Sequence, residues 1–333
     1  MSTIQTTHVR RAAQPGAAVL LLAVVAGVVV AGRVAGAGRV AWVETFVLIF
    51  TSIVVEALPF VLLGAGVSAA IEVFVPARAF DRVARLPLPL QLPGAAVGGL
   101  AFPVCECGSV PVARRLIARG MHPAAGIAFM LAAPILNPVV LLSTWIAYRG
   151  RGLALEMVLG RAAIGLLLAV AAGWALGNRG ASELLRPRPG GDDGGHDRDG
   201  GRTRAFVDHL AGDFFHMGRF VVAGSALAAA MQTVIPQSVV SGVATTPVVG
   251  ALALMAIAFV LSLCSEADAF VAVSLTPFPL GAQLAFMTFG PVVDTKLALL
   301  YGATFRDRFV ARLVIVAVPI VLAGSLWFEA IVS

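Results

Sequence analysis

Charged side chains are scarce in this chain of 333 residues: they make up 13% of it, whereas 59% is hydrophobic. A soluble domain is usually about 25% charged and about 45–50% apolar. The composition therefore excludes an ordinary soluble protein and predicts an integral membrane protein. The formal net charge of +6 does not indicate a nucleic-acid partner, because the arginines cluster at the ends of apolar runs, where cytoplasmic loops collect them.

Cysteine and lysine are also rare. The three cysteines are Cys105, Cys107 and Cys264, and the single lysine is Lys296. An odd number of cysteines without regular spacing argues against a disulfide framework. All three cysteines lie in apolar segments, so the sequence gives them no free access to the redox buffer on either side of a membrane.

The sequence motifs of common enzymes are missing as well. The chain contains no G-x-x-x-x-G-K-[ST] phosphate loop, so we expect that it does not itself hydrolyse ATP. It also contains no H-E-x-x-H metalloprotease motif and no G-x-S-x-G hydrolase motif. We therefore expect neither an enzyme nor a bound cofactor.

Long apolar runs dominate the rest of the chain. They predict an all-α polytopic membrane protein with about nine hydrophobic segments, since a spanning helix needs about 20 apolar residues. The first run follows Arg10 and Arg11, and we interpret it as a retained signal-anchor helix. The segments cover approximately residues 17–39, 45–75, 93–113, 123–147, 153–177, 213–235, 247–275, 281–303 and 309–331.

One stretch between these runs differs in composition. Residues 179–212 are rich in glycine, and their arginine and acidic residues balance, which is typical of a flexible hydrophilic linker. The linker suggests four parts: a signal-anchor region (1–44), a first membrane repeat (45–178), the linker (179–212) and a second membrane repeat (213–333).

Three sequence matches between the two halves indicate an internal repeat. The first match pairs Phe60 with Phe220, the second pairs Cys105 with Cys264, and the third pairs Asn137 with Asp294. The offset between the halves is nearly constant from one match to the next. Repeats of this size in a membrane protein point to a transporter. The arginine distribution favours inverted repeats with re-entrant, broken helices, and parallel repeats of four full spans are the alternative.

The most unusual stretch is Cys105-Glu106-Cys107-Gly108, which lies in an apolar run after Pro103. Thiolates select soft, thiophilic centres. On a regular helix these two cysteines would point about 200° apart, so both sulfurs can bind one centre only where the helix is unwound. Proline and glycine favour such unwinding. The alternative is that each cysteine is simply a small buried hydrophobic residue.

A second polar stretch, Cys264-Ser-Glu266-Ala-Asp268, echoes the first in the other half. Carboxylates at membrane depth are costly and are functional by default. They could bind a cation, transfer protons or pair with an arginine. If Glu106 and Glu266 approach one site, their repulsion favours holding a shared proton, which suits exchange of protons against substrate.

Two proline-containing stretches form the next pair. Pro134 and Asn137 lie opposite residues Pro291 and Asp294, and Lys296 follows closely. Proline inside a span breaks the helix and frees backbone carbonyls. The neighbouring Asn137 or Asp294 can satisfy freed backbone groups or contact substrate. Asp294 and Lys296 are two positions apart, so on a helix they need not pair.

Other polar residues in or near the spans have simpler interpretations. We expect Arg114, Arg115 and Arg119 to anchor a cytoplasmic interface, with attraction of an anionic substrate as the alternative. His216 is interpreted as an interior residue and not as part of the site.

Around the Cys105–Gly108 box and the downstream Pro134-x-x-Asn137-Pro138 pattern, the sequence resembles a large bacterial family of predicted permeases, over roughly residues 45–331. The few studied members of that family include organoarsenical efflux permeases. The resemblance implies a multi-pass permease of the inner (cytoplasmic) membrane with cysteine-bearing broken helices. At the level of residues it extends to Cys105, Cys107, Pro134 and Asn137.

Together these patterns predict a secondary transporter that exports a trivalent arsenical or a soft metal ion by alternating access. Cys105, Cys107 and Cys264 would bind this cargo as metal ligands. We expect membrane lipid, the substrate and a coupling proton as partners. The alternatives are a membrane-embedded thiol-redox subunit and a non-transporting membrane scaffold. The full set of candidate substrate-binding residues is Cys105, Glu106, Cys107, Pro134, Asn137, Cys264, Glu266, Asp268, Asp294 and Lys296.

Overall fold

The computed structural model describes residues 41–76, 78, 86–101, 104–178, 180–187, 201–234, 246–306 and 308–332. The predicted signal-anchor helix at 17–39 lies outside these residues. The chain divides into two compact units, residues 1–49 and 50–333, and all the contacts described below lie within the second. Apart from one isolated bridge between Leu185 and Phe305, the regular structure in the described residues is helical, as predicted.

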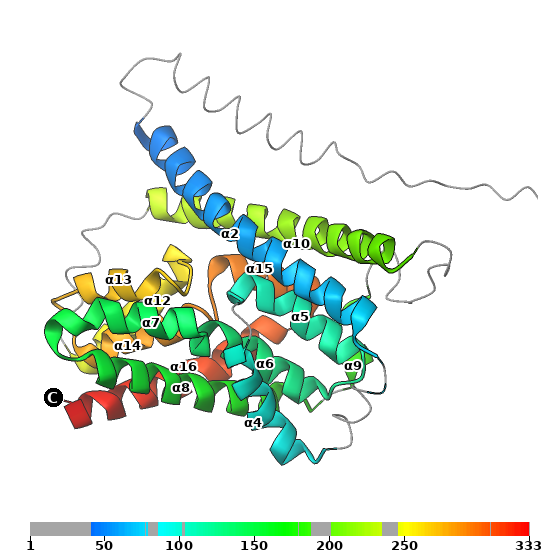
Figure 1. Cartoon of the computed structure of the whole chain (residues 1–333). Coiled ribbons are helices and arrows are strands. Elements are labelled where there is room, and N and C mark those ends of the chain that lie inside the picture. The colour runs from blue at the N-terminus through cyan, green and yellow to red at the C-terminus, as the bar shows by residue number, and fades with distance from the viewer. Residues whose placement is uncertain are drawn as a thin grey trace, which may run out of the picture. The chain divides into compact units, whose positions relative to one another are not determined.

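The first half contains long helices and short ones. Five helical stretches of the described chain are long and apolar enough to cross a membrane, and three of them lie in this half. In order, the half consists of α2 (Ala41–Phe74), α4 (Leu88–Gly98), the 3-10 turn η1 (Gly99–Ala101), α5 (Glu106–Ala118), α6 (Pro123–Leu136), α7 (Pro138–Tyr148), the 3-10 turn η2 (Arg149–Arg151) and α8 (Ala154–Leu176) (Figure 1).

The second half has a closely similar order of helices. After the short α9 (Ala181–Leu184), it consists of α10 (Gly201–Val234), α12 (Pro247–Leu261), α13 (Asp268–Ser274), α14 (Leu280–Phe289), α15 (Thr295–Thr304) and α16 (Phe309–Val332). The starts of α12, α14 and α15 follow those of α4, α6 and α7 at a nearly constant offset. This offset matches the one between the similar sequence stretches, so the order of helices agrees with the alignment of the two halves.

The predicted flexible linker at 179–212 is wrong for its last part, because residues 201–212 form the beginning of α10. The ring of Phe206 in this part lies against Phe74 of α2, and the buried Asp213 accepts a hydrogen bond of 2.6 Å from Ser68. The polar residues of the predicted linker therefore extend one helix that packs against α2. The first part of the predicted linker is also ordered at Leu185, which forms an isolated antiparallel β-bridge with Phe305.

Breaks interrupt four of the predicted hydrophobic segments. Asn137 is non-helical and caps α7, where its Oδ1 accepts a hydrogen bond of 2.9 Å from Val139 N. Asp294 caps α15 in the same way by accepting from Leu297 N at 2.6 Å. The other two breaks, between η1 and α5 and between α12 and α13, carry Cys105 and Cys264. Side-chain caps satisfy backbone donors that a broken helix would otherwise leave unpaired.

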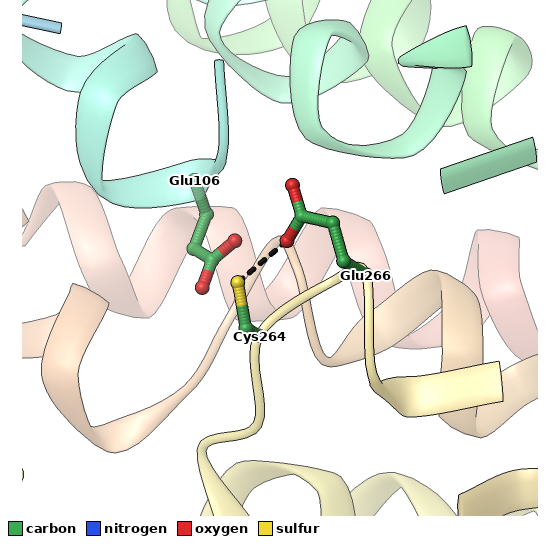
Figure 2. A group of neighbouring side chains, drawn as sticks. All are labelled: Glu106, Cys264 and Glu266. Atoms are coloured by element: carbon green, nitrogen blue, oxygen red, sulfur yellow. Dashed lines mark hydrogen bonds between the residues drawn. The ribbon is translucent and has the colours of Figure 1, made fainter. Parts of the chain in front are cut away.

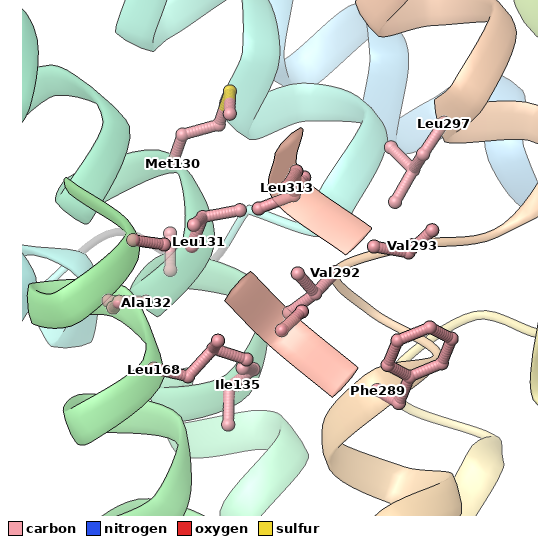
Figure 3. Close-up of a cluster of buried hydrophobic side chains, with 14 of the residues drawn as sticks. Met130, Leu131, Ala132, Ile135, Leu168, Phe289, Val292, Val293, Leu297 and Leu313 are labelled. Carbon is pink, nitrogen blue, oxygen red and sulfur yellow. The ribbon is translucent and has the colours of Figure 1, made fainter. Parts of the chain in front are cut away.

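Elements of both halves share one buried apolar core. Figure 3 shows side chains of α6 and α8 facing residues of the α14–α15 region and of α16. The labelled residues are Met130, Leu131, Ala132, Ile135, Leu168, Phe289, Val292, Val293, Leu297 and Leu313. This shared core brings the polar breaks of the two halves close together.

Glycines let two pairs of helices come unusually close. A Cβ added at Gly64 of α2 would overlap the backbone of Gly108 in α5. A Cβ added at Gly224 of α10 would lie 2.7 Å from the Cα of Lys296 in α15. Gly64 and Gly224 are the positions that the sequence aligns between the halves. Small residues at both positions thus bring α2 and α10 directly against the helices that carry Glu106 and Lys296.

Candidate functional site

The two cysteine-bearing breaks meet inside the protein. Glu106 is the first residue of α5, and residues 262–267 connect α12 to α13. The hydroxyl of Ser265 lies 3.1 Å from Oε2 of Glu106 and 3.3 Å from Oε2 of Glu266. Figure 2 shows the side chains of Glu106, Cys264 and Glu266 pointing toward one another. Segments from opposite halves of the sequence therefore form one polar cluster.

Three of these side chains form a group that could hold a metal ion. One ligand atom from each of Glu106, Cys264 and Glu266 lies within 4.8 Å of the others. The thiol of Cys264 donates a hydrogen bond to Oε2 of Glu266. Among the described residues, Oε1 of Glu266 is buried without a hydrogen-bond partner. A buried acceptor without a partner is unusual, and a bound cation or proton would satisfy it.

The three thiols lie next to one another. The thiol of Cys105 lies close enough to those of Cys107 and Cys264 to interact with both, and all three cysteines are buried and free. Cys105 caps α5 with an extended backbone, φ −74° and ψ 178°, and is not part of the helix. The predicted unwinding thus occurs at Cys105. Its sulfur is therefore not directed away from that of Cys107, as it would be on a regular helix.

A buried lysine joins this cluster. Nζ of Lys296 lies 3.5 Å from Oε1 of Glu106 and 3.7 Å from Oδ2 of Asp294. Lys296 is 3% exposed and Glu106 is 1% exposed. Lys296 and Asp294 pair although they are two positions apart, because Asp294 is the extended cap of α15 and not a helical residue. The ammonium group partly neutralises a concentration of carboxylates that would otherwise be costly to bury.

Sequence reasoning left one residue out of the site. Glu56 of α2 lies close enough to the thiol of Cys264 to interact with it, and it also interacts electrostatically with Lys296 and Glu106. The sequence feature that could have identified Glu56 is a carboxylate in a strongly apolar segment, which is also the feature that identified Glu266. Glu56 adds a fourth carboxylate, after those of Glu106, Glu266 and Asp294.

Asp268 is close in sequence to the cluster but has a different partner. Its two carboxylate oxygens accept hydrogen bonds of 2.8 and 2.7 Å from the guanidinium of Arg161 in α8. Arg161 is 0% exposed and also donates to Thr144 and to the carbonyl of Ser265. This bidentate pair is the arginine pairing considered for the carboxylates. Through Ser265, it fixes the loop that presents Cys264 and Glu266.

The remaining candidate residues, Pro134 and Asn137, lie just before and at the junction of α6 and α7. Pro134 lies inside α6, and the side chain of Asn137 accepts from the backbone at the start of α7. This is the backbone role that we considered for Asn137 alongside substrate contact. Ser109 of α5 donates to the carbonyl of Met130 at 3.0 Å and so ties the α5 break to α6.

The expectation that Arg114, Arg115 and Arg119 anchor a cytoplasmic interface is wrong for Arg114 and Arg115, whose side chains are buried. The guanidinium of Arg115 lies 3.1 Å from Glu72 and 3.5 Å from Asp213. Arg119 lies 2.7 Å from the same Glu72. Acidic residues of α2 and α10 thus draw the end of α5 into the protein, a contact that the local sequence did not reveal.

Comparisons with known proteins place the chain in a family of predicted permeases. Residues 43–329 match a family described as "Predicted permease". The UPF0718 protein YcgR of Bacillus subtilis (strain 168) is 40% identical over 296 residues, which cover 84% of this chain and 95% of that protein. A Streptococcus mutans protein named "Putative two-component membrane permease complex subunit" is 33% identical over 276 residues, which cover 80% of this chain and 89% of that protein. No solved structure matches the chain.

Proposed function

Because the chain belongs to the predicted-permease family and is a multi-pass membrane permease, we propose that it exports a thiophilic substrate across the inner membrane. The cargo is a trivalent arsenical or a soft metal ion. One observation carries this proposal: the two helix breaks meet and bring three thiols together with buried carboxylates. Thiolates supply soft ligands, and the carboxylates compensate the positive charge of a cation.

The mechanism that we propose is alternating access driven by proton exchange. The two halves have the same order of helices, and each supplies one break to the site. Rocking of one half against the other would expose such a site to each side of the membrane in turn. Inverted repeats fit this proposal, with α4 and α5 as a re-entrant element, since their 11 and 13 residues fall short of the about 20 needed to span.

Protons would be exchanged at the carboxylates. Glu106 and Glu266 share the hydroxyl of Ser265 and lie beside the thiol of Cys264. A cation entering this group would displace protons from the thiols and the carboxylates, because metal ligands must be deprotonated. Release of the cargo would allow the same groups to take up protons again. We also propose a second membrane component as a partner, on the model of the complex that the name of the Streptococcus relative describes.

The test is export by a deletion strain that carries variants of the chain. Growth is measured against trivalent arsenicals, antimony, copper and zinc, with protein levels in the membrane as a check on folding. We expect Cys264→Ala, which removes the thiol that contacts both Cys105 and Glu266, to abolish protection against the exported species. A matched control is Ser143→Ala, a buried position of α7 outside the cluster. Unchanged protection by the triple variant of Cys105, Cys107 and Cys264 would refute the thiol site.

A further inference from the structure

A separate cavity of about 420 Å³ lies between α5, α10, α15 and the segment after α9. Cavities of about 300–1,000 Å³ commonly hold small ligands. Its lining includes three arginines and a histidine and, among the described residues, no acidic side chain. The basic residues are Arg114, Arg186, His216 and Arg219. The cavity is therefore strongly basic.

Backbone carbonyls hold two of these arginines in place. Arg114 donates from Nη1 to the carbonyl of Arg186 at 2.9 Å and to that of Thr304 at 3.4 Å. Arg186 in turn donates from Nε to the carbonyl of Phe305 at 2.9 Å. The bridge between Leu185 and Phe305 fixes this segment beside the end of α15. These contacts fix the positions of two cationic groups in the wall of the cavity.

The third arginine is fixed by aromatic rings. The guanidinium of Arg219 lies 4.7 Å from the centre of the Phe220 ring, and its Nη2 is 3.0 Å from Nδ1 of His216. A planar guanidinium stacked on a ring keeps its edge donors available for a phosphate or carboxylate. Because Arg219 is exposed on α10, this edge can be reached from outside the protein.

Apolar residues form the rest of the cavity wall. Phe220 and Leu299 lie in the lining, and a Cβ added at Gly302 would meet no atom within 4 Å. The neighbouring Phe215 of α10 is 59% exposed, as is typical of a side chain that faces lipid. We propose that the cavity binds the phosphate-bearing headgroup of an anionic membrane lipid. Basic pockets between membrane helices bind such headgroups, and the apolar wall suits the glycerol and the first acyl carbons.

Such a lipid would fasten the helices that carry the polar cluster. Arg114 lies about two turns after Glu106 on α5, and Gly302 lies on the helix that begins beside Asp294 and Lys296. A headgroup between α5, α10 and α15 would hold their far ends together. Binding to the folded state stabilises it by mass action. The lipid site stands independently of which cargo the permease carries.

The test is thermal unfolding of the full-length protein in an uncharged detergent. Short-chain phosphatidylglycerol is titrated, with phosphatidylcholine of the same chain length and inorganic phosphate in parallel. We expect only phosphatidylglycerol to raise the unfolding temperature. Arg219→Gln should require roughly tenfold more lipid for the same shift, the loss expected for one charge-assisted contact. Arg202→Gln removes an exposed arginine of the same helix outside the cavity and should behave as the wild type.

A second variant tests the cavity without removing charge. Gly302→Leu would place a side chain in the open space and should weaken the lipid effect as Arg219→Gln does. Equal lipid responses of Arg219→Gln and Arg202→Gln would overturn the proposal, as would an equal effect of phosphatidylcholine. A full shift with inorganic phosphate alone would overturn the assignment to lipid and assign the cavity to a soluble phosphate compound.

Discussion

Replacing Asp268 by alanine should destabilise the protein strongly. The carboxylate of Asp268 makes two hydrogen bonds to Arg161, whose side chain is 0% exposed. Removing one partner of a buried ion pair leaves the other charge uncompensated and costs about 3–5 kcal/mol. Arg161 would keep only its bonds to Thr144 and to the carbonyl of Ser265, which are neutral groups. We therefore expect a loss at the upper part of that range.

The control is another arginine pair nearer the surface. Arg119 is 25% exposed, and its partner Glu72 keeps a second arginine, Arg115, when Arg119 is replaced. Arg119→Gln should therefore cost about 0–1 kcal/mol. The measurement is the free energy of unfolding in mixed micelles, followed by circular dichroism. A loss for Asp268→Ala within about 1 kcal/mol of the loss for Arg119→Gln would refute the reasoning.

The double variant Arg161→Met with Asp268→Leu separates stability from positioning. Apolar replacement of a buried ion pair is often neutral or stabilising, so this variant should recover most of the stability. It still lacks the hydrogen bond from Arg161 to the carbonyl of Ser265. We expect export to stay low in the stable double variant, because Cys264 and Glu266 lie on the loop that this bond holds. Full export would show that the pair has only a structural role.

Two further predictions use the same unfolding measurement. Gly64→Ala should cost about 1–3 kcal/mol, because the new Cβ overlaps the backbone of Gly108 and overpacking forces the helices apart; Gly66→Ala, where the nearest atom is 3.9 Å away, is the matched control and should be neutral or slightly stabilising. Lys296→Met should cost about 3–5 kcal/mol, because it leaves the buried Glu106 without its cation; unchanged stability would contradict the ion pair.

Several properties followed from the sequence because they depend on local chemistry. The high apolar content predicted a helical membrane protein, and the proline-containing segments predicted helix breaks at Asn137 and Asp294. The unwound backbone at Cys105 was also predictable, since both sulfurs of a Cys-x-Cys box can converge only outside a regular helix. Alignment of the two halves also predicts Cys264 as the counterpart of Cys105.

The tertiary structure decided which polar residues meet. Charge and position along a helix do not reveal a partner that is distant in the sequence, so the sequence could not separate Asp268, held by Arg161, from Glu266, which faces Glu106 and Cys264. For the same reason Glu56 was left out, and Arg115 was placed at an interface although Glu72 and Asp213 bury it. The sequence determined which residues are too costly to leave unpaired in a membrane, and the packing of helices from both halves determined how each is paired.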